Sequence, residues 1–122
     1  MSTNHRWDSM QVALQGPGVE IRRADDAGLA QCLIRLAAGT RTDELFAGLP
    51  EDQCQSAHWG YIVSGTMRVH SKEGAQDYLA GELYYWSAGH NLEAVTDAVY
   101  VEISPSADYD VLMAHCHQVL GS

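Results

Sequence analysis

Apolar and polar residues alternate with a period of two over much of the chain, which is the pattern of strands with one buried face. The first clear pair of such runs spans residues 19–24 and 29–38 and is joined by the short polar loop 25–28. Cys32 and Ile34 fall on the same face of the second run. The pattern therefore predicts an antiparallel hairpin with one side in the core.

Further runs of the same kind follow, each separated from the next by a glycine or a polar turn. They cover residues 58–70, with a break at Ser64-Gly65, and then 77–80, 83–86, 91–95 and 99–104. Short strands with a turn signal about every 8–12 residues are typical of a β-sandwich or barrel. Residues 39–53 hold glycines and a proline without a strand period, so we expect a long loop there.

The two ends of the chain differ from this middle part. Residues 1–18 predict a polar N-terminal arm, in which a short alternation from Met10 to Leu14 could add an edge strand. Residues 19–105 form the predicted barrel, and Pro105 ends its sheet. In residues 106–122 the apolar positions change to helical spacing, at Leu112, Cys116, Val119 and Leu120. We therefore expect one C-terminal helix packed on the barrel.

The composition narrows the class of protein. The chain has 122 residues, of which 46% are hydrophobic, as in a single globular domain. Sixteen acidic and seven basic residues give a net charge of -9, and Lys72 is the only lysine, which argues against a nucleic-acid or anionic-membrane partner. No apolar run approaches the roughly 20 residues of a membrane-spanning helix. The first residues lack the apolar stretch of a secretion signal, so we expect a cytoplasmic location.

Three residues of metal-ligand type stand where predicted strands begin or end: Cys54, His58 and His90. On a straight strand the Cα atoms of Cys54 and His58 would lie about 13 Å apart. One ion bound at about 2.0–2.3 Å could not reach both side chains at that separation. The short polar segment 55–57 permits the turn that would bring them together. The three cysteines include no CxxC pair, which argues against a disulfide framework.

The spacing of these residues resembles the first motif of the cupins, which are small jelly-roll barrels. In that motif two histidines one residue apart precede a glutamate, and a glycine follows the glutamate seven residues later. Counting back seven from Gly65 reaches His58 at the glutamate position. Four residues further back is Cys54 at the second-histidine position, and two more is Asp52 at the first.

The second cupin motif contains glycine, proline, glycine and histidine, and the stretch from Gly81 to His90 resembles it. Ser87 stands where the proline usually stands. His90 directly follows Gly89, whereas the usual histidine position of the family falls on Leu92. Both strings together resemble a subgroup of small bacterial cupins without an assigned activity.

The resemblance covers roughly residues 30–104 and implies an all-β fold, a double-stranded β-helix (jelly-roll) cupin barrel, here followed by a helix. It also implies one divalent transition metal held by Cys54, His58 and His90. Two imidazoles and a thiolate suit zinc, iron, copper or nickel, and three protein ligands leave one position open. The alternative is that Cys54 is a small buried hydrophobe and the histidines are hydrogen-bonded barrel residues. Of these two interpretations we favour the metal site.

These observations favour a metal-dependent enzyme acting on a small organic molecule, by analogy an organic acid or a carbonyl compound. Oxygenase, isomerase and lyase activities all stay open, because a fold does not choose among them. The competing hypothesis is a non-catalytic small-molecule-binding or sensor cupin that uses the same pocket. A third is a purely structural barrel with a filled interior. An open metal position beside a polar group of perturbed pKa would favour the enzyme.

Two acidic residues accompany the predicted ligands. Asp52 is a candidate fourth ligand or a partner that orients an imidazole, although an exposed loop position is favoured for it. Glu102 is a candidate general base inside the barrel. Its position out of phase with the neighbouring valines nevertheless favours a solvent-facing side chain. The predicted pocket comprises Gly60, Ile62, Tyr84, Trp86 and Glu102.

Aromatic residues are concentrated in two short segments, 59–61 and 84–86. Alternation sends Tyr84 and Trp86 to one side of their strand and Tyr85 to the other. At least one aromatic set should therefore point away from the site, and an aromatic outer face on a small barrel predicts a homodimer.

The tripeptide His115-Cys116-His117 suggests a second ligand cluster. On a helix, however, adjacent residues point about 100° apart, so the three side chains do not converge on one ion. We expect Cys116 in the core with a histidine on either side of it.

Overall fold

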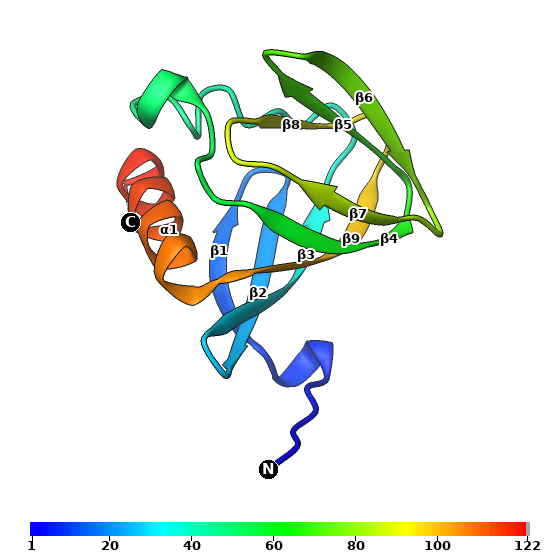
Figure 1. Cartoon of the computed structure of the whole chain (residues 1–122), viewed down its shortest axis with the longest axis vertical. Coiled ribbons are helices and arrows are strands. Elements are labelled where there is room, and N and C mark those ends of the chain that lie inside the picture. The colour runs from blue at the N-terminus through cyan, green and yellow to red at the C-terminus, as the bar shows by residue number, and fades with distance from the viewer. Residues whose placement is uncertain (122) are drawn as a thin grey trace.

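Two antiparallel β-sheets, drawn one above the other in Figure 1, enclose the core of the protein. The structure is a computed structural model and describes residues 1–121. The larger sheet has the strand order β1 (Gln11–Gly16), β2 (Val19–Asp26), β3 (Leu29–Leu36), β9 (Ala98–Pro105), β4 (His58–Ser64) and β7 (Leu83–Trp86). The smaller sheet has the order β6 (Gly74–Leu79), β5 (Thr66–Ser71) and β8 (Asn91–Ala94). The all-β prediction is confirmed.

The hairpin predicted in the first half of the chain is β2–β3, paired from Val19 with Leu36 to Asp26 with Leu29. The alternation near residue 12 is the edge strand β1, which pairs with β2. The break in the run 58–70 falls at Gly65, which has φ +82° and lies against the backbone of Asp97 and Ala98. A Cβ there would collide with the Asp97 carbonyl oxygen, so this turn requires glycine.

Strand β9 carries bulky side chains on both faces. Its buried positions alternate strictly, at Ala98, Tyr100, Glu102 and Ser104. The expectation that Glu102 faces solvent is therefore wrong, because this side chain is only 3% exposed. The outward-facing Val101 is itself only partly exposed, and it lines a shallow cavity with Leu33 of β3 and Trp7 of the N-terminal arm. An alternation with a period of two shows that a strand has two different faces, but it does not show which face is buried.

The N-terminal arm is fixed to the outside of the larger sheet by the short 3-10 helix η1 (Trp7–Ser9). The Trp7 ring contacts two guanidinium groups, those of Arg22 and Arg35, each 4.8 Å from the ring centroid. Cation–π contacts of this kind stabilise by about 0.5–2 kcal/mol each. Arg22 also donates hydrogen bonds to the carbonyl oxygens of Trp7 and Met10.

The predicted C-terminal helix is α1 (Ser106–Leu120), which lies beside β1 along one flank of the barrel (Figure 1). Its buried face consists of Tyr109, Leu112, Met113 and Cys116, which pack into the core. Gly121 ends the helix in the left-handed conformation. Within residues 1–121, no helix is both long and apolar enough to cross a membrane.

Candidate metal centre

The three candidate ligands come from different elements and meet between the two sheets. His58 is the first residue of β4. Cys54 and His90 lie opposite each other in an isolated antiparallel bridge, where the Cys54 N–H donates to the His90 carbonyl oxygen at 2.9 Å. The chain bends after Cys54, at the segment 55–57, before β4 begins. The turn that Cys54 and His58 need in order to share one ion is therefore present.

The ligand atoms of Cys54, His58 and His90 all lie within 4.8 Å of one another. Cys54 Sγ is 3.5 Å from His58 Nε2. In a tetrahedral zinc site with bonds of about 2.3 Å to sulfur and about 2.1 Å to nitrogen, these atoms would be about 3.6 Å apart. All three side chains are buried, at 0–1% exposed. The spacing and the burial both fit a metal ion between them.

His90 is held in the tautomer that a metal ligand needs. Its Nδ1 lies 2.7 Å from the carbonyl oxygen of Ser87, and because a carbonyl only accepts, Nδ1 carries the proton. Gly89, at φ +89°, makes the turn that allows this contact. Burial lowers the pKa of His90, so the ring is neutral. Nε2 therefore presents a lone pair, and it has no hydrogen-bond partner among the described residues.

His58 is oriented by a residue that the sequence analysis missed. Its Nδ1 lies 2.6 Å from the hydroxyl of Ser104, which is completely buried on β9. Burial and the neighbouring His90 lower the pKa of His58 to about 3, so this imidazole is neutral as well. Ser104 gave no motif signal. Only its inward position in the alternation of β9 could have identified it.

The Cys54 side chain is a protonated thiol in the metal-free protein, because burial raises its pKa to about 12. Its Sγ also lies 3.7 Å from the carbonyl oxygen of Ser56. A metal ion stabilises the thiolate and so displaces this proton.

Glu102 is the acidic group nearest to the ligands. Its Oε1 lies 3.6 Å from His58 Nε2, and burial raises its pKa to about 8. At neutral pH it is therefore mainly the uncharged acid. Tyr109, whose ring centroid is 6.2 Å from that of His58, lies on the helix side of the same region.

The structure does not bring Asp52 to the three ligands. Its side chain is exposed on the 3-10 turn η2 (Pro50–Asp52), and its carboxylate accepts a hydrogen bond from the Gly48 N–H at 2.9 Å. Its backbone carbonyl accepts from Asn91, next to His90. This position matches the exposed loop interpretation of Asp52.

The predicted pocket residues lie inside the barrel but do not line one common cavity. Tyr84 and Trp86 stack with their ring centroids 3.8 Å apart and fill much of the interior. The Tyr84 hydroxyl reaches the Val101 carbonyl oxygen past Gly60, where a Cβ would collide with both groups. Ile62 is fully buried in the core, and Glu102 lines an internal cavity of about 40 Å³, enough for one water molecule.

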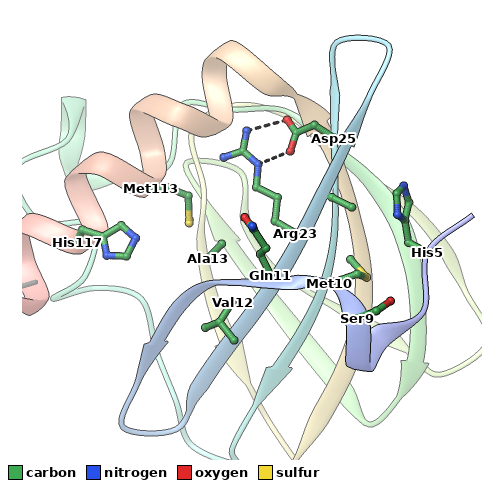
Figure 2. Close-up of a pocket in the computed structure, with 11 residues that line it drawn as sticks. His5, Ser9, Met10, Gln11, Val12, Ala13, Arg23, Asp25, Met113 and His117 are labelled. Carbon is green, nitrogen blue, oxygen red and sulfur yellow. Dashed lines mark hydrogen bonds and ion pairs between the residues drawn. The ribbon is translucent and has the colours of Figure 1, made fainter. Parts of the chain in front are cut away.

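A larger space adjoins the ligands from outside. A groove of about 290 Å³ lies between the β5–β6 hairpin and segment 85–90, and both Trp86 and His90 line it. The largest cavity, about 550 Å³, is elsewhere, between α1 and β1 (Figure 2). There Arg23 is already engaged by Asp25, as the dashed lines in Figure 2 show.

The cluster on α1 does not form a second centre in the described residues. Cys116 is buried in the core, and the His115 ring contacts the Ala47 carbonyl oxygen at 2.9 Å. His117 lies one residue further along the helix and lines the cavity beside β1. The expected arrangement, with Cys116 packed between two histidines, is confirmed.

The two packed antiparallel sheets have the architecture of a jelly-roll barrel. No family model matches the sequence, and no curated protein matches it. Among solved structures, Bacillus subtilis oxalate decarboxylase aligns with 86% of this chain and 30% of its own, at 20% identity and a TM-score of 0.62. An RmlC-like cupin from Shewanella frigidimarina aligns with 86% of this chain and 92% of its own, at 13% identity and a TM-score of 0.63.

The EutQ protein of Clostridium difficile matches 72% of this chain and 68% of its own, at 14% identity and a TM-score of 0.57. The chain thus spans less than a third of the oxalate decarboxylase chain but nearly all of the Shewanella cupin. The predicted cupin barrel is confirmed: this chain has the cupin fold. Together with the cluster of Cys54, His58 and His90, the fold is consistent with a metal-binding cupin.

Proposed function

We propose that Cys54, His58 and His90 bind one divalent transition metal and that the site acts enzymatically on a small organic molecule. The observation that carries this proposal is the unpartnered lone pair of His90 Nε2, buried beside two further ligand atoms. A buried polar atom without a partner costs about 1–3 kcal/mol, so its retention calls for a function. A metal ion removes this cost. Its identity, among zinc, iron, copper and nickel, is open.

Each neighbouring residue has a definable role in such a site. The Ser87 carbonyl and the Ser104 hydroxyl hold the two imidazoles in place. The metal would supply Lewis acidity or redox chemistry at its open position. Glu102, close to His58 and mainly protonated at neutral pH, is placed to hold or release a proton beside that position. A carboxyl group with a shifted pKa next to a metal favours a catalytic function over simple binding.

The alternative function is a non-catalytic cupin that binds or senses a small molecule in the same place. It is favoured by the tight interior, where Tyr84 and Trp86 stack in the core and the cavity beside Glu102 measures only about 40 Å³. The two functions differ in turnover. A sensor binds its ligand without consuming it, whereas an enzyme releases a product.

Metal content by mass spectrometry on untagged protein tests the site. We expect near-stoichiometric metal in the wild type and loss in Cys54→Ser and in His58→Ala. The matched controls are Cys116→Ser and His115→Ala, which change the same residue types outside the cluster. A wild type that takes up none of the four metals, or controls that lose metal equally, would overturn the proposal.

We further propose that the protein is a homodimer formed through the outer face of β4 and β7. Leu83 is 82% exposed, Tyr85 54% and Trp59 48%, and the Trp59 and Tyr85 rings touch with centroids 5.1 Å apart. Tyr61 and Val63 extend the same apolar face along β4. Contiguous exposed apolar and aromatic side chains of this kind often mark interaction sites. A second copy and a cytoplasmic location both stay predictions.

A further inference from the structure

The groove next to the candidate metal centre has a distinctive lining. It measures about 290 Å³, room for a small organic molecule. Its polar side chains are hydroxyls, an amide, an indole, an imidazole and one carboxylate, in the residues Ser71, Glu73, Gln76, Tyr78, Tyr85, Trp86, Ser87 and His90. None of the described residues that line it is arginine or lysine. A carboxylate ligand would therefore find no cationic side chain here to replace its hydration.

Two of the residues that line the groove, Trp86 and His90, each carry a buried ring nitrogen with no hydrogen-bond partner among the described residues. Trp86 Nε1 belongs to a side chain that is 2% exposed, and His90 Nε2 to one that is 1% exposed. The indole N–H only donates, and His90 Nε2 only accepts because its Nδ1 carries the proton. The two rings are neighbours, with centroids 6.2 Å apart. A metal on His90 would still leave the indole N–H without a partner among the described residues.

We propose that the groove binds a small uncharged molecule that bears a carbonyl, amide or hydroxyl oxygen, and that this oxygen accepts a hydrogen bond from Trp86 Nε1. In the metal-free protein the groove discriminates against carboxylates, because Glu73 and the net charge of -9 both repel anions. The carbonyl compounds expected from the fold analogy match this lining, and the organic acids do not. The inference deepens the proposed function and rests on it for the chemistry that follows binding.

The test follows the Trp86 indole N–H resonance by NMR of ¹⁵N-labelled, metal-free protein. The three indole signals are assigned by elimination with Trp7→Phe and Trp59→Phe, which leave the core intact. The probes are pairs of equal shape and different charge, acetamide with acetate and malonamide with malonate, at matched ionic strength. We expect the amides to shift the Trp86 signal with at least tenfold tighter binding than the carboxylates. The signals of Trp7 and Trp59 should stay in place.

The Glu73→Gln variant probes the source of the discrimination. It should narrow the difference between malonamide and malonate, whereas Glu44→Gln, exposed and outside the groove, should leave it unchanged. A carboxylate that shifts Trp86 as strongly as its amide, or amides that leave Trp86 unmoved, would overturn the inference. Because the titration uses metal-free protein, failure of the metal site shows up separately, in the metal content alone.

Discussion

Replacing Glu102 with glutamine tests whether a buried acid destabilises the metal-free protein as the pH rises. The side chain is 3% exposed, and burial raises its pKa from 4.5 to about 8. In the unfolded chain the same carboxyl group titrates near its ordinary value. Between these two pKa values the unfolded chain has lost a proton that the folded protein keeps. The contribution of Glu102 to stability is therefore fully present below about pH 4.5 and is lost as the pH rises through about 8.

The magnitude follows from linkage. One proton of difference changes the free energy of unfolding by about 1.4 kcal/mol per pH unit, so the whole window amounts to at most about 5 kcal/mol. Glu102→Gln cannot ionise and lacks this slope. The buried His58, whose pKa is lowered to about 3, destabilises both proteins alike as the pH falls below about 6.5. Its effect cancels in the difference between variant and wild type.

Urea denaturation at pH 5, 6, 7 and 8, in the presence of a chelator, measures this difference. We expect the stability of Glu102→Gln relative to wild type to rise by about 3.5 kcal/mol from pH 5 to pH 8, with the steepest change between pH 6 and 7. Glu44→Gln, an exposed carboxylate outside the core, is the control and should follow the wild type. Parallel curves for Glu102→Gln and wild type from pH 5 to 8 would refute the assigned pKa.

Three further predictions concern the ligand orientation, the interior and the outer face. Ser104→Ala removes the hydroxyl that lies 2.6 Å from His58 Nδ1. We expect it to weaken metal affinity about 10–100-fold, measured in competition with a chelating dye. Unchanged affinity would exclude a role of Ser104 in orienting His58. Gly60→Ala should lower the free energy of unfolding in urea by about 1–3 kcal/mol, because the added Cβ would collide with the Val101 carbonyl and the Tyr84 hydroxyl. An unchanged urea midpoint would show that the backbone shifts to accommodate the methyl group. Leu83→Glu should convert the dimer to a monomer, measured by sedimentation. Val111→Glu, on the exposed face of α1, should leave the dimer intact. A monomeric wild type would contradict the homodimer.

The sequence by itself determined the local structure. The period of two located most strands of both sheets, although β6 begins three residues before the predicted run 77–80, and the change to helical spacing located α1 within residues 106–122. These patterns are readable because they depend on neighbours a few residues apart. The spacing from Gly65 back to Cys54 and the position of Gly89 also singled out the three ligand-type side chains that the fold brings together. Cys54 and His58 are close in the chain, so only a turn had to be inferred between them.

The tertiary structure alone decided what surrounds those side chains. Ser104 meets His58 across 46 residues of sequence, and Glu102 reaches the site because β9 pairs with β4. The N-terminal arm partly covers the face of β9 opposite Glu102, which the alternation in the sequence did not reveal. The stacking of the Tyr84 ring on the Trp86 ring, which fills part of the barrel interior, is likewise a tertiary contact. Alternation along a strand defines two faces, but which face is buried depends on long-range packing, which a local pattern does not contain.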